Sequence, residues 1–231
     1  MMRRSLLLGA FAVAAFVLAQ PTPSSAAGDA AAFVNQLETQ GMQALSAPTA
    51  QRAARFRQLF QADFDAPEIA RFVLGRYWNT FSPQQQQEFV SVFEDFTAHA
   101  YAEKLGQYAG SPFKIIGTRP GEGGTVVTSE IDRANGPAVK VDWHVVDRGG
   151  RFVVSDVVLD GVSMKVTERN EFAGIIQRNN NNPTAIIAVL RQQLQQGGAS
   201  YGSSAPRQQT PQQQAPQQPA PAYGTAPGPR R

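Results

Sequence analysis

A stretch at 137–166, PAVKVDWHVVDRGGRFVVSDVVLDGVSMKV, constrains the fold more strongly than any other part of this chain. Its first half alternates polar residues with four apolar ones, Val139, Val141, Trp143 and Val145. Alternation with a period of two is typical of a strand that is buried on one face. The glycines of 147–150 suit a tight turn, and 152–159 returns as a second apolar strand. The stretch therefore predicts a β-hairpin whose apolar face must be covered, either by a solid core or by a ligand.

The first 27 residues are predicted to be a secretory signal peptide. A short basic start is followed by an apolar run over 6–19 and by small residues that end at Ala26 and Ala27. The apolar run is shorter than the ~20 residues that a membrane-spanning helix needs. We therefore expect export with cleavage after Ala26 or Ala27. The Arg3-Arg4 pair leaves the general secretory and twin-arginine routes both open.

The segment 197–231 differs in composition from the rest of the chain. It is rich in Gln, Pro, Ala, Gly and Ser, and it contains no acidic residue. A segment of this kind cannot bury enough apolar surface to offset its conformational entropy, so we predict a disordered tail. A partner-binding role for this tail and the absence of any specific role are both open.

Setting the two ends aside reverses the sign of the net charge. The whole chain has a formal net charge of +3, with 21 basic and 18 acidic residues. Five basic residues lie in the two ends, which leaves 16 basic residues against 18 acidic ones over 28–196, a net charge near −2. The length of 28–196 predicts one domain, and its charge does not support nucleic-acid binding.

Apolar residues at helical spacing predict four helices before the strands, over 30–45, 49–60, 65–78 and 82–106. The first two helices carry the apolar stripes Phe33, Leu37, Met42, Leu45 and Phe56, Leu59, Phe60. An acid followed by an early proline at Asp65 and a capping box at Ser82 mark helix starts. The helix over 82–106 is unusually aromatic, and such a stripe can pack a solid core or line a ligand site.

The pattern changes to strands after Pro112. Strands are predicted over 113–117 and 125–132, and the two strands of the hairpin follow them. Helices return over 163–177 and 184–195. This order predicts an α+β fold, in which helices pack on one face of a curved antiparallel sheet of about four strands and leave an apolar pocket between.

No set of residues has catalytic or metal-binding spacing. The chain has no cysteine, and neither of its two histidines, His99 and His144, has a ligand partner at suitable spacing on its own element. His144 with Asp142, and Asp156 with Asp160, are the acid–base candidates. Polar residues that alternate along a strand are usually solvated, so we predict no catalytic residue, no metal and no cofactor.

Two segments resemble the MlaC-like phospholipid-binding proteins, a family that includes the toluene-tolerance auxiliary proteins and the hopanoid-associated HpnM proteins. Residues 156–172 contain DVVLDGVSM and then ERNEF, close to the family pattern D-x-x-x-D-G-V-S and R-x-x-F, which ends here at Arg169 and Phe172. Upstream, VLGRYW at 73–78 resembles the family's V-L-G-x-Y-W helix. The resemblance extends over about 30–195.

The resemblance implies a periplasmic shuttle without catalytic activity. Such a protein carries a lipid, here a phospholipid or a hopanoid, between an outer-membrane lipoprotein complex and an inner-membrane ABC transporter with its MCE-domain ring. The acyl tails would lie between sheet and helices, and we expect the protein to be a monomer. The candidate lipid-binding residues are Phe72, Trp78, Phe89, Phe93, Phe96, Val139, Val141, Trp143, Val153 and Val158.

Two other functions are compatible with the residues alone. Helices followed by a curved antiparallel sheet also describe enzymes with a cone-shaped pocket that act on small apolar substrates, although this likeness is architectural only. A non-catalytic interaction module that acts through the segment 197–231 is the other alternative.

Overall fold

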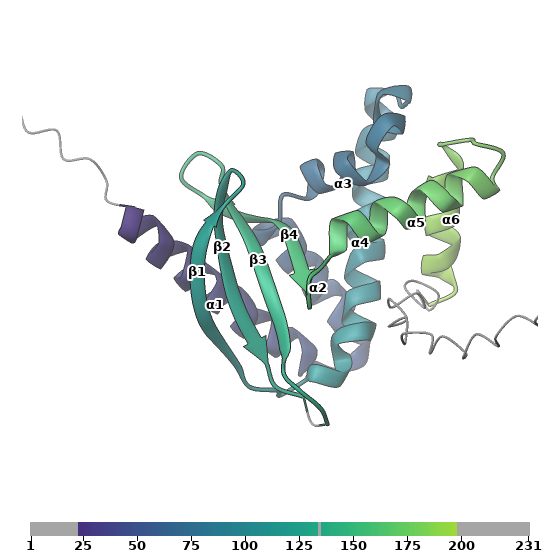
Figure 1. Cartoon of the computed structure of the whole chain (residues 1–231). Helices are drawn as coiled ribbons and strands as arrows, with labels where there is room; N and C mark the ends of the chain where they lie inside the picture. Colours follow the sequence, from purple (N-terminus) through teal and green to yellow (C-terminus); the bar gives the residue numbers. More distant parts are fainter. Residues whose placement is uncertain (1–22, 134, 198–231) are drawn as a thin grey trace, which may run out of the picture. The chain divides into compact units, whose positions relative to one another are not determined.

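The computed structural model describes residues 23–133 and 135–197 of the chain (Figure 1). Its helices and strands confirm an α+β fold. They follow one another in this order: α1 (Pro23–Leu45), α2 (Thr49–Asp63), α3 (Ala66–Leu74), η1 (Gly75–Thr80), α4 (Pro83–Lys104), η2 (Leu105–Tyr108), β1 (Phe113–Gly121), β2 (Gly124–Ile131), β3 (Val139–Asp147), β4 (Phe152–Leu159), β5 (Val162–Ser163), α5 (Met164–Arg178) and α6 (Ala185–Gln195).

The two predicted terminal segments lie almost wholly outside the described residues. Residues 1–22 of the predicted signal peptide and 198–231 of the predicted tail are not described, so both assignments stay predictions. Helix α1 begins at Pro23, seven residues before the predicted helix and ahead of the predicted cleavage site. No helix within the described ranges is both long and apolar enough to cross a bilayer.

The two predicted helix starts have different local structures. At Ser82 the capping box is present, because Ser82 Oγ accepts from the Gln85 backbone N–H and the Gln85 side chain accepts from the Ser82 backbone N–H. Asp65 does precede α3, but its side chain makes no cap hydrogen bond. Asp65 is thus the N-cap residue of α3, as predicted, but its carboxylate accepts from Arg148 Nε at 2.8 Å and not from the helix backbone.

The sheet is an antiparallel meander in the order β1-β2-β3-β4-β5. It has one strand more than the four predicted, because Val162–Ser163 pairs with the end of β4 before α5 begins. The predicted hairpin turn is present, with Gly149 at φ 70° and Gly150 at φ 87°, values that favour glycine. Its Gly150 N–H donates to Asp147 Oδ1, which closes the turn.

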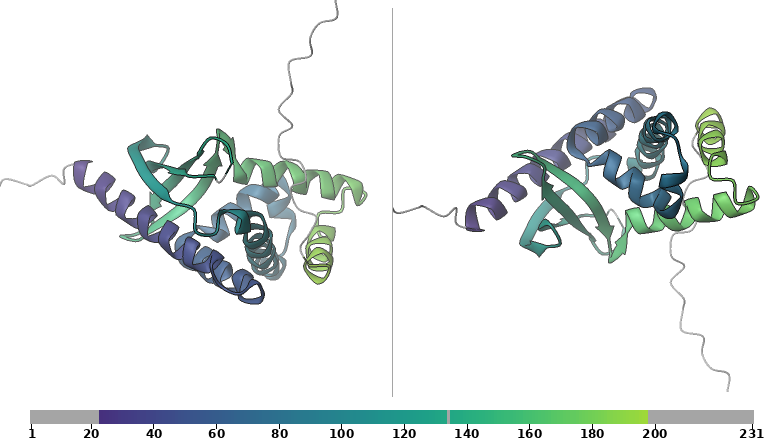
Figure 2. Two further views of the ribbon diagram at one scale, coloured as in Figure 1. Left: turned by 90° about the horizontal axis from the view of Figure 1, so that it is seen from below. Right: turned by 90° about the horizontal axis from the view of Figure 1, so that it is seen from above.

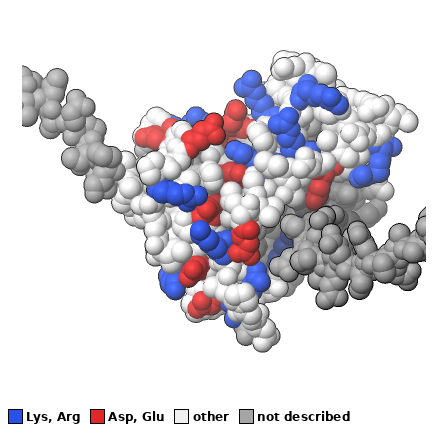
Figure 3. All heavy atoms as spheres, viewed as in Figure 1, with Lys and Arg blue, Asp and Glu red and all other residues white. Residues whose placement is uncertain are grey.

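The two faces of the sheet differ in polarity. On the inner face, Ala30 and Val34 of α1 pack against Val127 and Val145. The outer face carries cross-strand ion pairs, such as Lys114 Nζ with Glu130 Oε2 at 3.1 Å. Figure 3 shows basic and acidic side chains interspersed over this side of the molecule. The inner face therefore needs an apolar cover, whereas the outer face is polar where these ion pairs lie.

The helices cover the sheet unevenly. Helix α1 runs along the sheet, whereas α3, α4, α5 and α6 gather beyond one of its ends (Figure 2). Helix α2 packs against α4, α3 against α5, and α6 against α4. Only α1 and parts of α2, α3 and α5 contact the strands extensively. This arrangement leaves room between the sheet and the helical group.

Candidate functional site: an apolar cavity between sheet and helices

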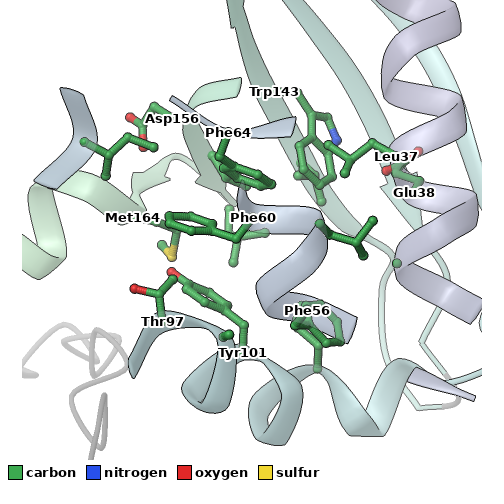
Figure 4. Close-up of a pocket in the computed structure, with 18 of the residues that line it drawn as sticks. Leu37, Glu38, Phe56, Phe60, Phe64, Thr97, Tyr101, Trp143, Asp156 and Met164 are labelled. Carbon is green, nitrogen blue, oxygen red and sulfur yellow. The ribbon is translucent and has the colours of Figure 1, made fainter. Parts of the chain in front are cut away.

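A cavity with an empty volume of about 1130 Å³, its open mouth included, lies between the inner face of the sheet and the helices (Figure 4). Its wall is predominantly apolar and comes from nearly every element of the domain. The lining residues are Leu37, Glu38, Gly41, Met42, Leu45, Phe56, Leu59, Phe60, Phe64, Ile69, Thr97, Ala98, Tyr101, Leu105, Ile131, Val141, Trp143, Asp156, Val157, Leu159, Met164, Lys165 and Glu168.

Helices α1 and α2 supply one side of the wall. The residues that do so belong to the apolar stripes from which these helices were predicted. Leu37, Met42 and Leu45 come from α1. Phe56, Leu59 and Phe60 come from α2, and Phe64 follows it. Residues at helical spacing share a face, so each stripe turns as a unit toward the cavity. Reasoning from the sequence had assigned both stripes to helix packing and neither to ligand contact.

The sheet supplies the opposite side through β3 and β4. Val141 pairs in register with Leu159, and Trp143 pairs with Val157. Directly opposed residues on antiparallel strands point to the same face. All four therefore line the cavity together.

Helix α4 borders the cavity with side chains other than its buried phenylalanines. Thr97, Ala98 and Tyr101 face the empty space. Gly41 of α1 also lines it, and no atom lies within 4 Å of the position that a Cβ on Gly41 would take. Small side chains on two elements thus keep the space open.

One polar group on the wall is the carboxyl of Glu38, which is buried at 5% exposure. Glu38 Oε1 accepts a hydrogen bond from Ser129 Oγ at 2.5 Å, and Ser129 Oγ accepts in turn from Trp143 Nε1 at 3.0 Å. Burial raises the pKa of Glu38 to about 7, against the lowering effect of its hydrogen bonds. Figure 4 shows the Glu38 carboxyl beside the Trp143 ring.

A second polar group comes from α5 and α4. Glu168 is 4% exposed, and burial raises its pKa to about 8, assisted by the nearby Glu171 carboxyl and opposed by Lys104. The Tyr101 hydroxyl lies 3.5 Å from Glu168 Oε1, and burial raises the pKa of Tyr101. The buried Thr97 hydroxyl has no hydrogen-bond partner within the described residues. Near pH 7 Glu168 is therefore largely neutral, and Glu38 is about half protonated.

The ten predicted lipid-binding residues are divided by the fold. Val141 and Trp143 lie on the cavity wall, and the other eight do not. Phe89, Phe93 and Phe96 instead surround Phe172, with ring centroids 6.1 to 6.4 Å from its ring. This aromatic cluster fills its own space and faces no cavity, because each of its rings is at most 1% exposed and packs against the others.

The remaining five predicted residues occupy four different environments. Phe72 lies on α3 under two cations, Lys165 Nζ at 5.0 Å and the Arg169 guanidinium at 5.1 Å from its ring centroid. The backbone carbonyl of Trp78 accepts from Gln86 Nε2. Val139 is buried on β3 beyond the cavity wall. That leaves the two predicted residues of β4, Val153 and Val158.

The β4 valines lie on the other face of the sheet from Val141. Val153 pairs with Val146, and Val158 pairs with Asp142, whose carboxylate accepts from Thr128 and Arg119 on the polar face. The pairing of β3 with β4 shifts register between His144 and Val145, and this shift places both valines on the same face. Whether any of these ten residues contacts a lipid stays a prediction.

The acid–base candidates have structural partners of their own. Asp142 is held by Thr128 and Arg119; burial works to raise the pKa of Asp142, but these hydrogen bonds and the Arg119 charge hold it below its usual value. Asp156 accepts from Ser163 Oγ and from the Lys165 backbone N–H at the start of α5. Within the described residues, no group of three or more His, Cys, Asp or Glu side chains could hold a metal ion.

Comparisons with known proteins identify the family of this chain. A family model described as MlaC protein matches residues 30–192. The chain is 25% identical over 184 residues to the "Toluene tolerance protein ttg2D" of Pseudomonas putida. The aligned region covers 78% of this chain and 85% of the Pseudomonas protein. It is 26% identical over 129 residues to the "Intermembrane phospholipid transport system binding protein MlaC" of Haemophilus influenzae, over 54% of this chain and 59% of that one.

A solved structure shares the fold. It is the phospholipid-binding protein from Ralstonia solanacearum in complex with a phospholipid, with a TM-score of 0.61 and 21% sequence identity over 72% of this chain and 97% of that one. MlaC proteins are periplasmic, non-catalytic lipid-binding transport proteins. All lining residues of the cavity lie inside the matched range. Since the family model spans more than half of the sequence, this chain belongs to the MlaC family.

Proposed function

We propose that this protein is the periplasmic binding protein of an intermembrane phospholipid transport system and carries its lipid in the cavity between sheet and helices. The observation that carries the proposal is the apolar wall, which α1, α2, β3 and β4 build together. Burial of acyl chains contributes about 0.8 kcal/mol per methylene, so such a wall can hold a lipid with few polar contacts. Membership of the MlaC family and the phospholipid held by the Ralstonia protein support this ligand class.

The proposed partners follow from the family and from the Haemophilus relative, which is named as part of a transport system. They are an inner-membrane ABC transporter with an MCE-domain ring and an outer-membrane lipoprotein complex, between which the chain shuttles as a monomer. The signal peptide predicted over 1–27 would deliver it to the periplasm. A hopanoid is the alternative lipid.

Organic extraction and mass spectrometry of the purified protein test the proposal. We expect one phospholipid for each protein molecule, and we expect lipid-stripped protein to take up phosphatidylglycerol or phosphatidylethanolamine from vesicles. Deletion of 197–231 should leave this uptake intact, whereas an interaction module that works through the tail would lose its function. Protein that is purified without lipid and takes none from vesicles would refute the proposal, and a hopanoid mass would correct the ligand.

A further inference from the structure

The side chain of Glu38 presents an unused hydrogen-bonding oxygen at the cavity wall. Its Oε2 atom is buried and has no hydrogen-bond partner within the described part of the chain. Buried polar atoms are almost always paired, because an unpaired one loses its hydration without compensation. Glu38 itself is one of the cavity-lining residues, so a bound ligand is placed to supply the missing partner.

The hydrogen bonds around Glu38 run in one direction only. An indole N–H can only donate, so Trp143 Nε1 donates to Ser129 Oγ. The Ser129 hydroxyl then gives its single proton to Glu38 Oε1. Oε1 is therefore an acceptor, and a proton on the neutral carboxyl belongs on Oε2. The neutral side chain of this cavity-lining residue thus carries a buried O–H donor that has no partner within the described residues.

A phospholipid has a matching group between its head and its tails. Its acyl-ester carbonyls are uncharged acceptors attached directly to the apolar chains. The apolar residues beside Glu38 on the wall, Leu37 and Met42 of α1 and Trp143 of β3, would contact those chains. A protonated carboxyl can donate to such a carbonyl, whereas a carboxylate can only accept and would repel its oxygen.

We propose that Glu38 donates a hydrogen bond from Oε2 to an acyl-ester carbonyl of the bound lipid, and that this contact makes the cavity prefer ester-linked to ether-linked phospholipids. The proposal rests on the function proposed above. It assigns Glu38 the role of a specificity-determining residue, with Ser129 and Trp143 as the residues that orient it. The raised pKa of Glu38 supports it, since the carboxyl is mostly protonated at pH 6.

A competition between two lipids tests this contact. Lipid-stripped protein is mixed at pH 6 with vesicles that contain equal amounts of dioleoyl phosphatidylglycerol and its dioleyl diether analogue, and the two bound masses are counted by native mass spectrometry. We expect the wild type to prefer the diester about 3- to 10-fold, the value of one net hydrogen bond. A ratio measured within one sample does not depend on how much of the protein is folded.

Three variants isolate the donor. Glu38→Gln keeps an N–H donor in the position of Oε2 and should keep the preference, whereas Glu38→Met should lose it. Glu171→Met is the matched control, because Glu171 lies outside the cavity wall; it should bind as the wild type does. A wild type without preference, or a Glu38→Met variant that retains it, would overturn the proposal.

The pH dependence provides a second measurement. The wild-type preference should fall between pH 6 and pH 8.5 as Glu38 ionises, and it should not fall in Glu38→Gln. The other titratable groups on the wall are Tyr101 on α4, Asp156 on β4, and Lys165 and Glu168 on α5, and Glu38→Gln retains all four. A preference that is unchanged by pH in the wild type contradicts the proposal. Failure to bind either lipid would instead refute the proposed function itself.

Discussion

The two parts of α4 differ in what they pack against. Toward its start, Phe89, Phe93 and Phe96 interlock with Phe172 and leave no space. Farther along, Thr97, Ala98 and Tyr101 border a cavity. The rings of α4 and α5 fill the space between these two helices, whereas Thr97 and Ala98 leave a space that Phe56 and Phe60 of α2 also border. An aromatic stripe alone therefore does not distinguish solid packing from a ligand site, because the residues across the space decide which of the two forms.

The largest expected effect is in the solid part. Phe93→Ala should lower the free energy of unfolding by about 3 to 5 kcal/mol, because it removes a fully buried ring from a close-packed cluster. Phe56→Ala at the cavity wall is the comparison, and it should cost clearly less because the half-buried Phe56 ring already borders empty space. Urea unfolding of the lipid-stripped proteins measures both, and equal costs would contradict the distinction between the two regions.

The buried carboxyls of the hollow part should make stability depend on pH. The pKa of Glu168 is about 8 in the folded protein and near 4.5 when unfolded, so the folded state keeps a proton that the unfolded state releases. This stabilisation is fully present below about pH 4.5 and is lost as pH rises to about 8. Glu168→Gln, which cannot ionise, should reduce the loss by a few kcal/mol on the order-of-magnitude scale of such shifts. Urea midpoints at pH 5 and pH 8.5 measure it, and an identical decline in both proteins would exclude Glu168 as a cause.

Substitution of Gly41 by alanine should have the smallest effect on stability, and larger substitutions there test ligand binding separately from packing. Gly41→Ala should raise the free energy of unfolding by about 0.5 to 1 kcal/mol, since alanine is the better helix former and its Cβ meets no atom. Lipid uptake should persist in this variant. Gly41→Phe should fold and yet take up much less phospholipid, because its ring would occupy the cavity. Uptake at the wild-type level by Gly41→Phe would show that the ligand lies elsewhere.

Features that depend on neighbours in the chain were predictable. Period-two alternation identified β3 and the hairpin, and the capping box identified the start of α4. The start of α3 and its N-cap residue Asp65 were also predicted, but the partner of the Asp65 carboxylate, Arg148 from the β3–β4 turn, was not. A distant partner of this kind leaves no local trace in a sequence.

The candidate site was only partly predictable for the same reason. Val141 and Trp143 were placed correctly on the inner face, since alternation fixes which residues share a face of one strand. Along β4, the register shift between His144 and Val145 places Val154 opposite Val145 and turns Val153 to the outer face, where alternation also places Val158. Glu38 is visible in the sequence as an acidic residue between Leu37 and Met42 of an apolar stripe, but this pattern did not lead to a predicted site.

Local periodicity and short motifs are enough to assign the helices and strands, the α+β class and the family. Which apolar surfaces touch one another, and which surround a cavity, depends on the three-dimensional arrangement of the elements. Both kinds of surface have the same composition, and burial against protein or against a ligand removes the same apolar area from water. The difference lies in the distance between elements that are far apart in the chain, which side-chain volumes and strand register set together.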